Sequence, residues 1–180
     1  QPEEALELSR AIQPMCKDNA ELQKLMASSS QHADQMDSAI EGFELVLQSN
    51  PEDEDAICAL SELYGQRHRD DNHAIEIYNQ AQSLRPQESC HYIAAARAYA
   101  RRDSWDNVVQ IIRTLMTQSP TSISSAIALM IELVEQAPRI MQLRWFLVDA
   151  LTFEGRLLEA RNHTTEILRI DPDQNNRALK

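Results

Sequence analysis

The sequence predicts an all-α protein built from stacked antiparallel helical hairpins, and three observations support this class. Only 3 of 180 residues are glycine, and the dipeptides Asn-Gly and Asp-Gly, which favour β-hairpins, are absent. Apolar residues make up 43% of the chain, which is enough for a continuous core. Pro51, Pro86 and Pro120 follow one another at intervals of 35 and 34 residues, and such regularity is typical of repeat architectures.

Each of these prolines, and Pro172 later in the chain, is preceded by the same pattern. The residues 12, 8 and 5 positions before it are mostly small, aromatic or aliphatic: Ala39, Phe43 and Val46; Ala74, Tyr78 and Ala81; Val108, Ile112 and Leu115; Ala160, Thr164 and Ile167. Spacings of four and three place such residues on one face of a helix. We therefore expect each of these four prolines to follow the end of the second helix of a hairpin. The small residues let two helices approach closely, and the aromatic residues fill the space between hairpins.

The N-terminal third predicts three helices. One covers residues 2–13 and ends at Pro14. The next covers residues 17–30, with Leu25 in its apolar face. Ser38 and Glu41 have the spacing of a capping box and predict the start of the third helix, which continues to about residue 49.

Residues 50–86 predict the most regular hairpin. Asn50-Pro51 is a helix breaker, and the four acids at 52–55 stand at a helix N-terminus. There we expect them to stabilise the helix dipole rather than to bind a ligand. The first helix is predicted to reach about residue 67, and residues 72–84 form the second.

The C-terminal half continues the pattern with one interruption. Tyr92, Ala95, Ala96 and Tyr99 predict a first helix, Asp103-Ser104 a turn and cap, and Val108 to Leu115 a second helix. A lone helix follows at 122–136, then a hairpin formed by helices 139–153 and 156–169, with Gly155 in the turn. A rival pairing joins 122–136 to 139–153, but it puts Gln142 and Asp149 where small residues belong.

This pattern resembles the tetratricopeptide repeat (TPR) family, whose unit is a 34-residue helix–turn–helix. The resemblance covers about residues 20–172 and rests on three sets: Tyr64, Ala74, Tyr78, Ala81 and Pro86; Tyr99 and Pro120; Leu147, Gly155, Ala160 and Pro172. The usual Leu-Gly pair of the first helix is replaced by Leu60-Ser61, Ala95-Ala96 and Leu147-Val148. The resemblance implies an α-solenoid with a right-handed superhelix.

We interpret residues 1–180 as one TPR-like domain. It has a helical lead-in at 1–16, repeats at about 20–51, 55–86 and 89–120, the lone helix at about 122–136, and a repeat at about 139–172. Residues 173–180 are interpreted as a partial cap or the start of a further repeat. The chain is also compatible with a fragment of a longer repeat protein or of an enzyme.

Charge excludes some partner classes. The net charge is −11, and residues 1–86 hold 17 acids and 6 bases while the remainder is balanced. A nucleic-acid partner is not expected, because such proteins present a basic face. The acidic half serves solubility or, alternatively, attracts a basic partner.

Cysteine usage and hydropathy bear on the compartment. Cys16, Cys58 and Cys90 are odd in number and scattered, which favours buried free thiols in a reducing compartment. No apolar run is long enough to span a membrane, and no signal peptide is visible. These features predict a cytoplasmic protein without membrane insertion.

TPR arrays use the concave surface formed by their first helices to hold an extended or helical peptide. The resemblance therefore implies a partner-binding groove lined by Glu62, Gln66, Ile93, Ala94, Arg97, Arg101, Trp145, Phe146, Asp149 and Phe153. Arg97 and Arg101 are one helical turn apart, so they could hold a carboxylate or phosphate together; pairing with an acid such as Glu62 is the alternative. The three aromatic residues are either partner anchors or core packing against helix 122–136.

Other chemistries lack a motif. A carboxylate-clamp groove is rejected, because of the positions that would form it only Lys24 has a suitable side chain; the others hold Ser28, Ala59, Cys90 and Ala94. His68 and His73 flank a turn, but no zinc-binding pattern accompanies them. No nucleophile elbow or phosphate loop occurs, so we predict neither catalysis, metal nor cofactor.

The sequence thus predicts a non-catalytic scaffold for protein–protein interaction that binds a peptide or protein partner. Two alternatives stay open. The chain could be an oligomerisation or spacer segment of a larger assembly, including a homo-oligomer, or it could be the regulatory TPR arm of a larger enzyme.

Overall fold

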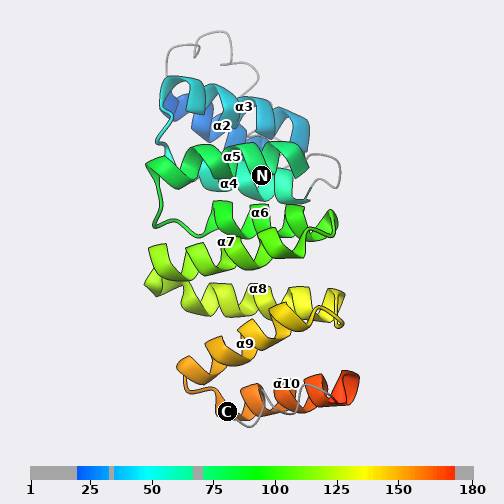
Figure 1. The fold of residues 1–180 in the computed structure, drawn as a ribbon. Coiled ribbons are helices and arrows are strands. Elements are labelled where there is room, and N and C mark those ends of the chain that lie inside the picture. Colours follow the sequence, from blue (N-terminus) through cyan, green and yellow to red (C-terminus); the bar gives the residue numbers. More distant parts are fainter. Residues whose placement is uncertain (1–19, 33–34, 67–70, 173–180) are drawn as a thin grey trace. The chain divides into compact units, whose positions relative to one another are not determined.

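The computed structural model describes residues 20–32, 35–66 and 71–172, and within these ranges it contains helices and turns but no strand (Figure 1). The all-α class is confirmed. The predicted helix at 2–13 and the segment at 173–180 lie outside the described residues. The helices are α2 (Ala20–His32), α3 (Met36–Ser49), α4 (Glu54–Gln66), α5 (Asp71–Leu84), α6 (Cys90–Arg101), α7 (Trp105–Gln118), the 3-10 turn η2 (Pro120–Ser122), α8 (Ile123–Gln136), α9 (Met141–Phe153) and α10 (Leu157–Ile170).

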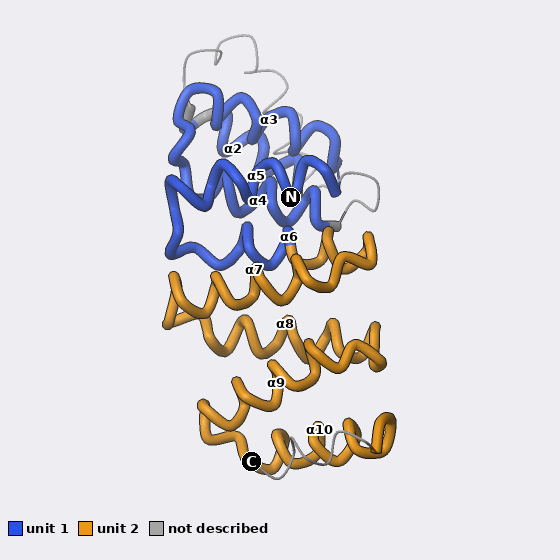
Figure 2. Tube along the Cα trace, viewed as in Figure 1, with its two compact units in different colours: residues 1–95 blue, residues 96–180 orange. Residues whose placement is uncertain are grey.

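The helices belong to two compact units, residues 1–95 and 96–180, and α6 crosses the boundary (Figure 2). In the first unit α2 packs on α3, α3 on α4, and α4 on α5. In the second unit α9 packs most extensively on α10 and also contacts α8 and α7. Consecutive helices are therefore neighbours within each unit, as hairpin stacking requires. The boundaries of the individual repeats stay predictions.

Small residues lie in the core at the positions that the period selects. Ala39, Ala74 and Ala160 are buried, as are the aromatic side chains of Phe43 and Tyr78. In the last repeat Thr164 replaces the aromatic residue, and its hydroxyl donates to the backbone oxygen of Ala160 at 2.8 Å. The polar atom is thus satisfied within its own helix.

Helices α2 and α3 of the first hairpin approach each other closely at Gly42 of α3. A Cβ atom on Gly42 would lie 2.8 Å from the Cβ and 3.2 Å from the Cα of Ala27. Real Cβ atoms do not tolerate the shorter distance, and a backbone atom cannot rotate away from the contact. The spacing of α2 and α3 therefore depends on the missing side chain.

Two hairpin turns of the second unit have the same backbone form. Asp103 and Gly155 adopt positive φ angles of 57° and 75°. In each turn the next residue donates back five positions, Ser104 to Tyr99 at 2.9 Å and Arg156 to Leu151 at 2.8 Å. This is the Schellman ending of a helix. The predicted turns at these positions are observed.

Three local predictions are wrong: the capping box at Ser38, the burial of Leu25 and the cap at Ser104. Helix α3 begins at Met36 with Gln35 as its cap residue and no side-chain cap bond, so Ser38 lies inside the first turn and cannot form the expected capping box. Leu25 is 63% exposed, whereas Ala27 and Ser30 form the buried face of α2. Ser104 also makes no side-chain cap bond to α7, because its hydroxyl oxygen accepts from Asn107 instead.

The expectation of three free thiols is also wrong. Cys58 of α4 and Cys90 of α6 form a disulfide, with Cα atoms 5.3 Å apart. The two cysteines are separated by 32 residues, close to one repeat period. Neighbouring hairpins therefore bring the two cysteines side by side. The odd number of cysteines favours free thiols instead of this pair. Cys16 lies outside the described residues.

Replacing Gly42 by alanine is expected to destabilise the first unit. Replacing glycine by alanine within a helix stabilises the folded state by about 1 kcal/mol. Overpacking destabilises it by about 1–3 kcal/mol, and here the new contact involves the Ala27 backbone, which cannot move aside. Gly65→Ala is the control, because its new Cβ would lie an ordinary 3.6 Å from Ala94. In urea unfolding, Gly42→Ala should have a lower free energy of unfolding than the native chain. Gly65→Ala should have the same free energy of unfolding or a higher one. Equal stability of the native chain and Gly42→Ala would contradict the close approach.

Candidate functional site

An open hollow of about 320 Å³ lies between α2 and α4. Most of its wall comes from these two first helices, and buried Phe43 of α3 forms part of its floor. We call it the α2–α4 hollow; its lining is Lys24, Ser28, Gln31, Phe43, Asp55, Cys58, Ala59 and Glu62. Three of the positions selected by repeat register, Lys24, Ser28 and Ala59, lie here together with Glu62.

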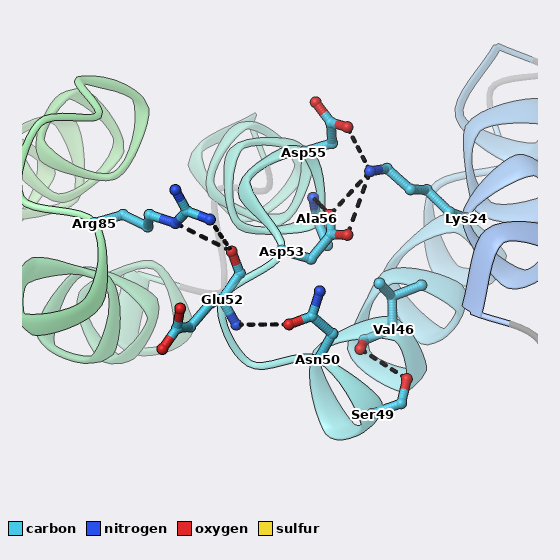
Figure 3. Close-up of polar contacts among 9 residues, drawn as sticks. All are labelled: Lys24, Val46, Ser49, Asn50, Glu52, Asp53, Asp55, Ala56 and Arg85. Atoms are coloured by element: carbon cyan, nitrogen blue, oxygen red, sulfur yellow. Dashed lines mark hydrogen bonds and ion pairs between the residues drawn. The ribbon is translucent and has the colours of Figure 1, made fainter.

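Lys24 is the only cation in this lining, and acids on α4 and at its start neutralise it. Its Nζ lies 3.1 Å from Asp53 Oδ1 and also contacts Asp55 Oδ2 (Figure 3). The hydrogen bond to Asp55 raises the pKa of the Lys24 ammonium. The Glu62 side chain is exposed, and it makes no hydrogen bond or ion pair with another described residue. The hollow therefore presents a carboxylate that a partner can reach.

The connection from α3 to α4 is fixed from both sides, and this positions the wall of the hollow. Asp53 Oδ1 accepts from the Ala56 backbone N–H at 3.0 Å, which caps α4. Arg85, just after α5, donates from Nε and Nη2 to the Glu52 carbonyl oxygen at 3.2 and 3.0 Å (Figure 3). Lys24 holds the same segment from α2. The carboxylates of Asp53 and Asp55 thus have structural roles beyond a general dipole effect.

A second hollow of about 290 Å³ opens between α3, α4 and α5. Its lining is Glu44, Leu47, Gln48, Leu60, Tyr64, His73, Glu76, Ile77 and Gln80. Tyr64 donates its hydroxyl to Glu44 Oε1 at 2.5 Å and stacks on the ring of His73, with centroids 5.1 Å apart. This hollow belongs mainly to the second helices, so it lies apart from the surface that repeat register selects.

The predicted groove residues on α6 differ in accessibility. Ala94 is buried and Ile93 is half-buried, whereas Arg101 is exposed. Arg97 donates from Nε and Nη2 to the two carboxylate oxygens of Glu132 at 3.1 and 2.7 Å. It therefore forms a bidentate ion pair, with an acid on α8 rather than with Glu62. A partner carboxylate would have to compete with Glu132. Gln66 ends α4, and its side chain is outside what the structure describes.

The predicted aromatic anchors on α9 also differ. Trp145 is buried in the core, and Phe146 is half-buried with the Arg113 guanidinium 5.7 Å from its ring centroid, a cation–π contact. Asp149 is exposed, and Phe153 is 77% exposed at the end of the helix. Phe153 and Asp149 are thus the accessible members of this group.

Two features of the site escaped sequence reasoning. The Cys58–Cys90 disulfide lies at the hollow. The two cysteines are 32 residues apart in the sequence, close to the repeat period, and this spacing could have indicated the bond. The ion pairs of Lys24 join residues 29 and 31 positions apart, and that spacing could have been found by aligning successive first helices. Both features link one repeat to the next.

Within residues 20–32, 35–66 and 71–172, no group of three or more metal-ligating side chains gathers at one place. His68, which the sequence places beside the turn before α5, lies outside these ranges. No helix in the same ranges has the length and apolar character needed to cross a membrane.

His91 has an unusual environment in the core. It is fully buried, and its ring lies 4.3 Å from that of Tyr92 and 6.0 Å from that of Tyr78, centroid to centroid. Neither ring nitrogen has a hydrogen-bond partner among the described residues. Burial lowers the pKa of His91 to about 4, because the charged form loses its hydration.

Comparisons with known proteins support the fold. No protein-family model matches the sequence, and no curated protein matches it. Two crystal structures of MamA are similar at 14% identity: one has a TM-score of 0.52 and covers 87% of this chain and 94% of that chain, and the other has a TM-score of 0.50 and covers 84% and 97%. The structure of TTC0263, a thermophilic TPR protein in Thermus thermophilus, has 16% identity, a TM-score of 0.49 and coverage of 84% and 100%. At this identity the likeness to the two MamA structures concerns the fold alone, and it agrees with an all-α arrangement of stacked helices.

Acidification is expected to destabilise the chain through His91. Between its unfolded pKa near 6.5 and its folded pKa of about 4, only the unfolded state binds the proton. The free energy of unfolding should therefore fall as pH drops from 7 to 4, by about 3 kcal/mol from this group. His91→Phe should flatten the slope of stability against pH between 7 and 5, where most carboxylates do not titrate. Identical slopes for the two proteins in urea unfolding would refute the assignment.

Proposed function

We propose that this chain is a non-catalytic scaffold that binds a peptide or protein partner on the surface of its first helices. The α2–α4 hollow is the observation that carries the proposal. It combines a buried aromatic floor at Phe43, a small residue at Ala59 that leaves space, and exposed polar groups at its rim. Such a combination suits a side chain of an extended or helical segment. The TPR-like fold supports the same reading.

Within this proposal each unit contributes its own part of the surface that repeat register selects. The first unit contributes Glu62, and the second contributes Arg97 and Arg101 on α6 and Asp149 and Phe153 on α9. Arg97 would engage a partner only by exchanging Glu132 for a partner carboxylate. Arg101 and Phe153 are exposed as they stand. Trp145 and Ala94 are buried, so they pack in the core and do not contact a partner directly.

Charge reversal at Glu62 is expected to weaken binding of a groove ligand. Peptides are first selected by display against the native chain, and their dissociation constants are then measured by fluorescence polarisation. Glu62→Arg should raise the constant at least about tenfold, or about 1.4 kcal/mol. The matched control is Glu41→Arg, which changes the same charge at an exposed site of the same unit outside both hollows.

The control should bind within about twofold of the native chain. Two results would contradict the proposal. If Glu62→Arg binds every selected peptide as the native chain does, the hollow is not the site. If both variants lose affinity equally, the effect comes from net charge and not from the groove.

A second candidate function, self-association, is favoured by a separate observation. Three large apolar side chains lie exposed around the α9–α10 turn: Phe153 at 77%, Leu157 at 62% and Leu158 at 78%. Exposed apolar groups gathered within six residues are typical of interaction surfaces. Under this reading the chain is an oligomerisation segment whose contact is this turn.

Light scattering tests the second candidate. The native chain should show a mass above that of one chain at high micromolar concentration, and Leu158→Glu should return it to a monomer because burying the new charge is unfavourable. Leu84→Glu is the control, since Leu84 is exposed elsewhere, at the end of α5. A native chain that is monomeric throughout would rule this candidate out.

A further inference from the structure

The Cys58–Cys90 disulfide lies at the proposed binding surface and links two successive first helices. Cys58 is in the second turn of α4 and is part of the α2–α4 hollow lining. Cys90 is the first residue of α6. Their Cα atoms are 5.3 Å apart, which lies within the usual range for a disulfide. The bond therefore ties the wall of the hollow to the beginning of the next repeat.

Both cysteines are partly exposed, and this separates the pair from a purely structural bridge. Each has intermediate burial, whereas the core residues beside them in sequence, Ile57 and His91, are buried. A disulfide whose sulfur atoms can be reached by a thiolate can be exchanged. Because Cys58 lines an open hollow, a reductant can enter by the same route that a ligand would use.

We propose that Cys58–Cys90 is a reversible thiol–disulfide exchange site that controls the α2–α4 hollow. The reductant is a dithiol, one of whose thiolates attacks one sulfur of the pair. The protein S–S bond breaks, a mixed disulfide forms, and the second thiol of the reductant then displaces the protein sulfur. The dithiol leaves as a cyclic disulfide, and its two electrons and two protons end on Cys58 and Cys90 as thiols. Oxidation by a cyclic disulfide reverses each step.

The consequence for the hollow follows from what the bond constrains. With the bond closed, Cys58 is held against the first turn of α6, and the lining of the hollow is fixed at that point. With the bond open, two separate thiols need more space than one S–S bond, and α4 and α6 are held together there by packing alone. This consequence rests on the proposed function, since it concerns affinity for the same groove ligand. By linkage, a ligand that prefers the oxidised form must also make the pair harder to reduce, by the same factor.

The experiment uses the full chain with Cys16→Ser, so that no third thiol can exchange. The chain is equilibrated in buffers of reduced and oxidised dithiothreitol, and thiols are trapped by alkylation and counted by mass spectrometry. We expect two alkylations in reducing buffer, none in oxidising buffer, and full recovery when the buffer is reversed. Two alkylations in every buffer, or a bond that resists an excess of dithiothreitol without denaturant, would overturn the proposal.

Hydrogen exchange reads the state of the hollow without any ligand. Amides of α4 around Cys58 and of the first turn of α6 should lose protection by about fivefold on reduction, while those of α9 and α10 should not change. The Cys58→Ser, Cys90→Ser double variant should match the reduced protein in either buffer. Unchanged exchange in α4 and α6 would show that the bond does not shape the hollow.

A selected peptide supplies the last measurement. The oxidised chain should bind it at least about fivefold more tightly than the reduced chain, and equal affinity would overturn control of the site. The peptide should also shift the thiol–disulfide equilibrium by the same factor. If no peptide can be selected against either form, the proposed function fails, while alkylation and hydrogen exchange still decide whether the pair is an exchange site that shapes the hollow.

Discussion

Close approach between antiparallel helices is the constraint on which the rest of this structure depends. A hairpin buries little apolar surface by itself, so its two helices must come near enough to share a face, and only small side chains permit that distance. Gly42 against Ala27 shows how narrow the tolerance is. Once the spacing is set, larger side chains such as Phe43 and Tyr78 fill the gaps that remain. The sequence period therefore arises because each hairpin needs small residues at the same positions.

The period made the all-α fold predictable. Helix ends were placed within a few residues because prolines and turn residues interrupt the pattern at fixed offsets. Lys24, Ser28 and Ala59, which do not make up a carboxylate clamp, line one hollow together with Glu62; a binding role for this surface stays a prediction. The wrong predictions share one cause. Those for Leu25 and Ser38 use the pattern of a single helix, and that for Cys58 and Cys90 uses the number of cysteines. Burial and disulfide bonding depend instead on the neighbouring helix.

Several polar contacts of the first unit join one helix, or the segment beside it, to another. Lys24 reaches from α2 to the start of α4, and Arg85 reaches from the end of α5 to the Glu52 carbonyl. Exposed ion pairs contribute little stability individually, but these converge on one short connection and fix its conformation. The same connection carries the residues that begin the wall of the hollow. Orientation of the candidate site thus depends on contacts outside it.

The covalent link between α4 and α6 also bears on how the chain unfolds. Repeat arrays are nearly one-dimensional, so each repeat can open at the expense of its neighbouring interfaces only, and fraying can advance one hairpin at a time. A bond between Cys58 and Cys90 encloses all of α5 in a closed loop. The end of α4, α5 and the start of α6 can then no longer separate by fraying alone. Oxidation would therefore merge two adjacent cooperative units into one, and partial unfolding would have to begin elsewhere in the array.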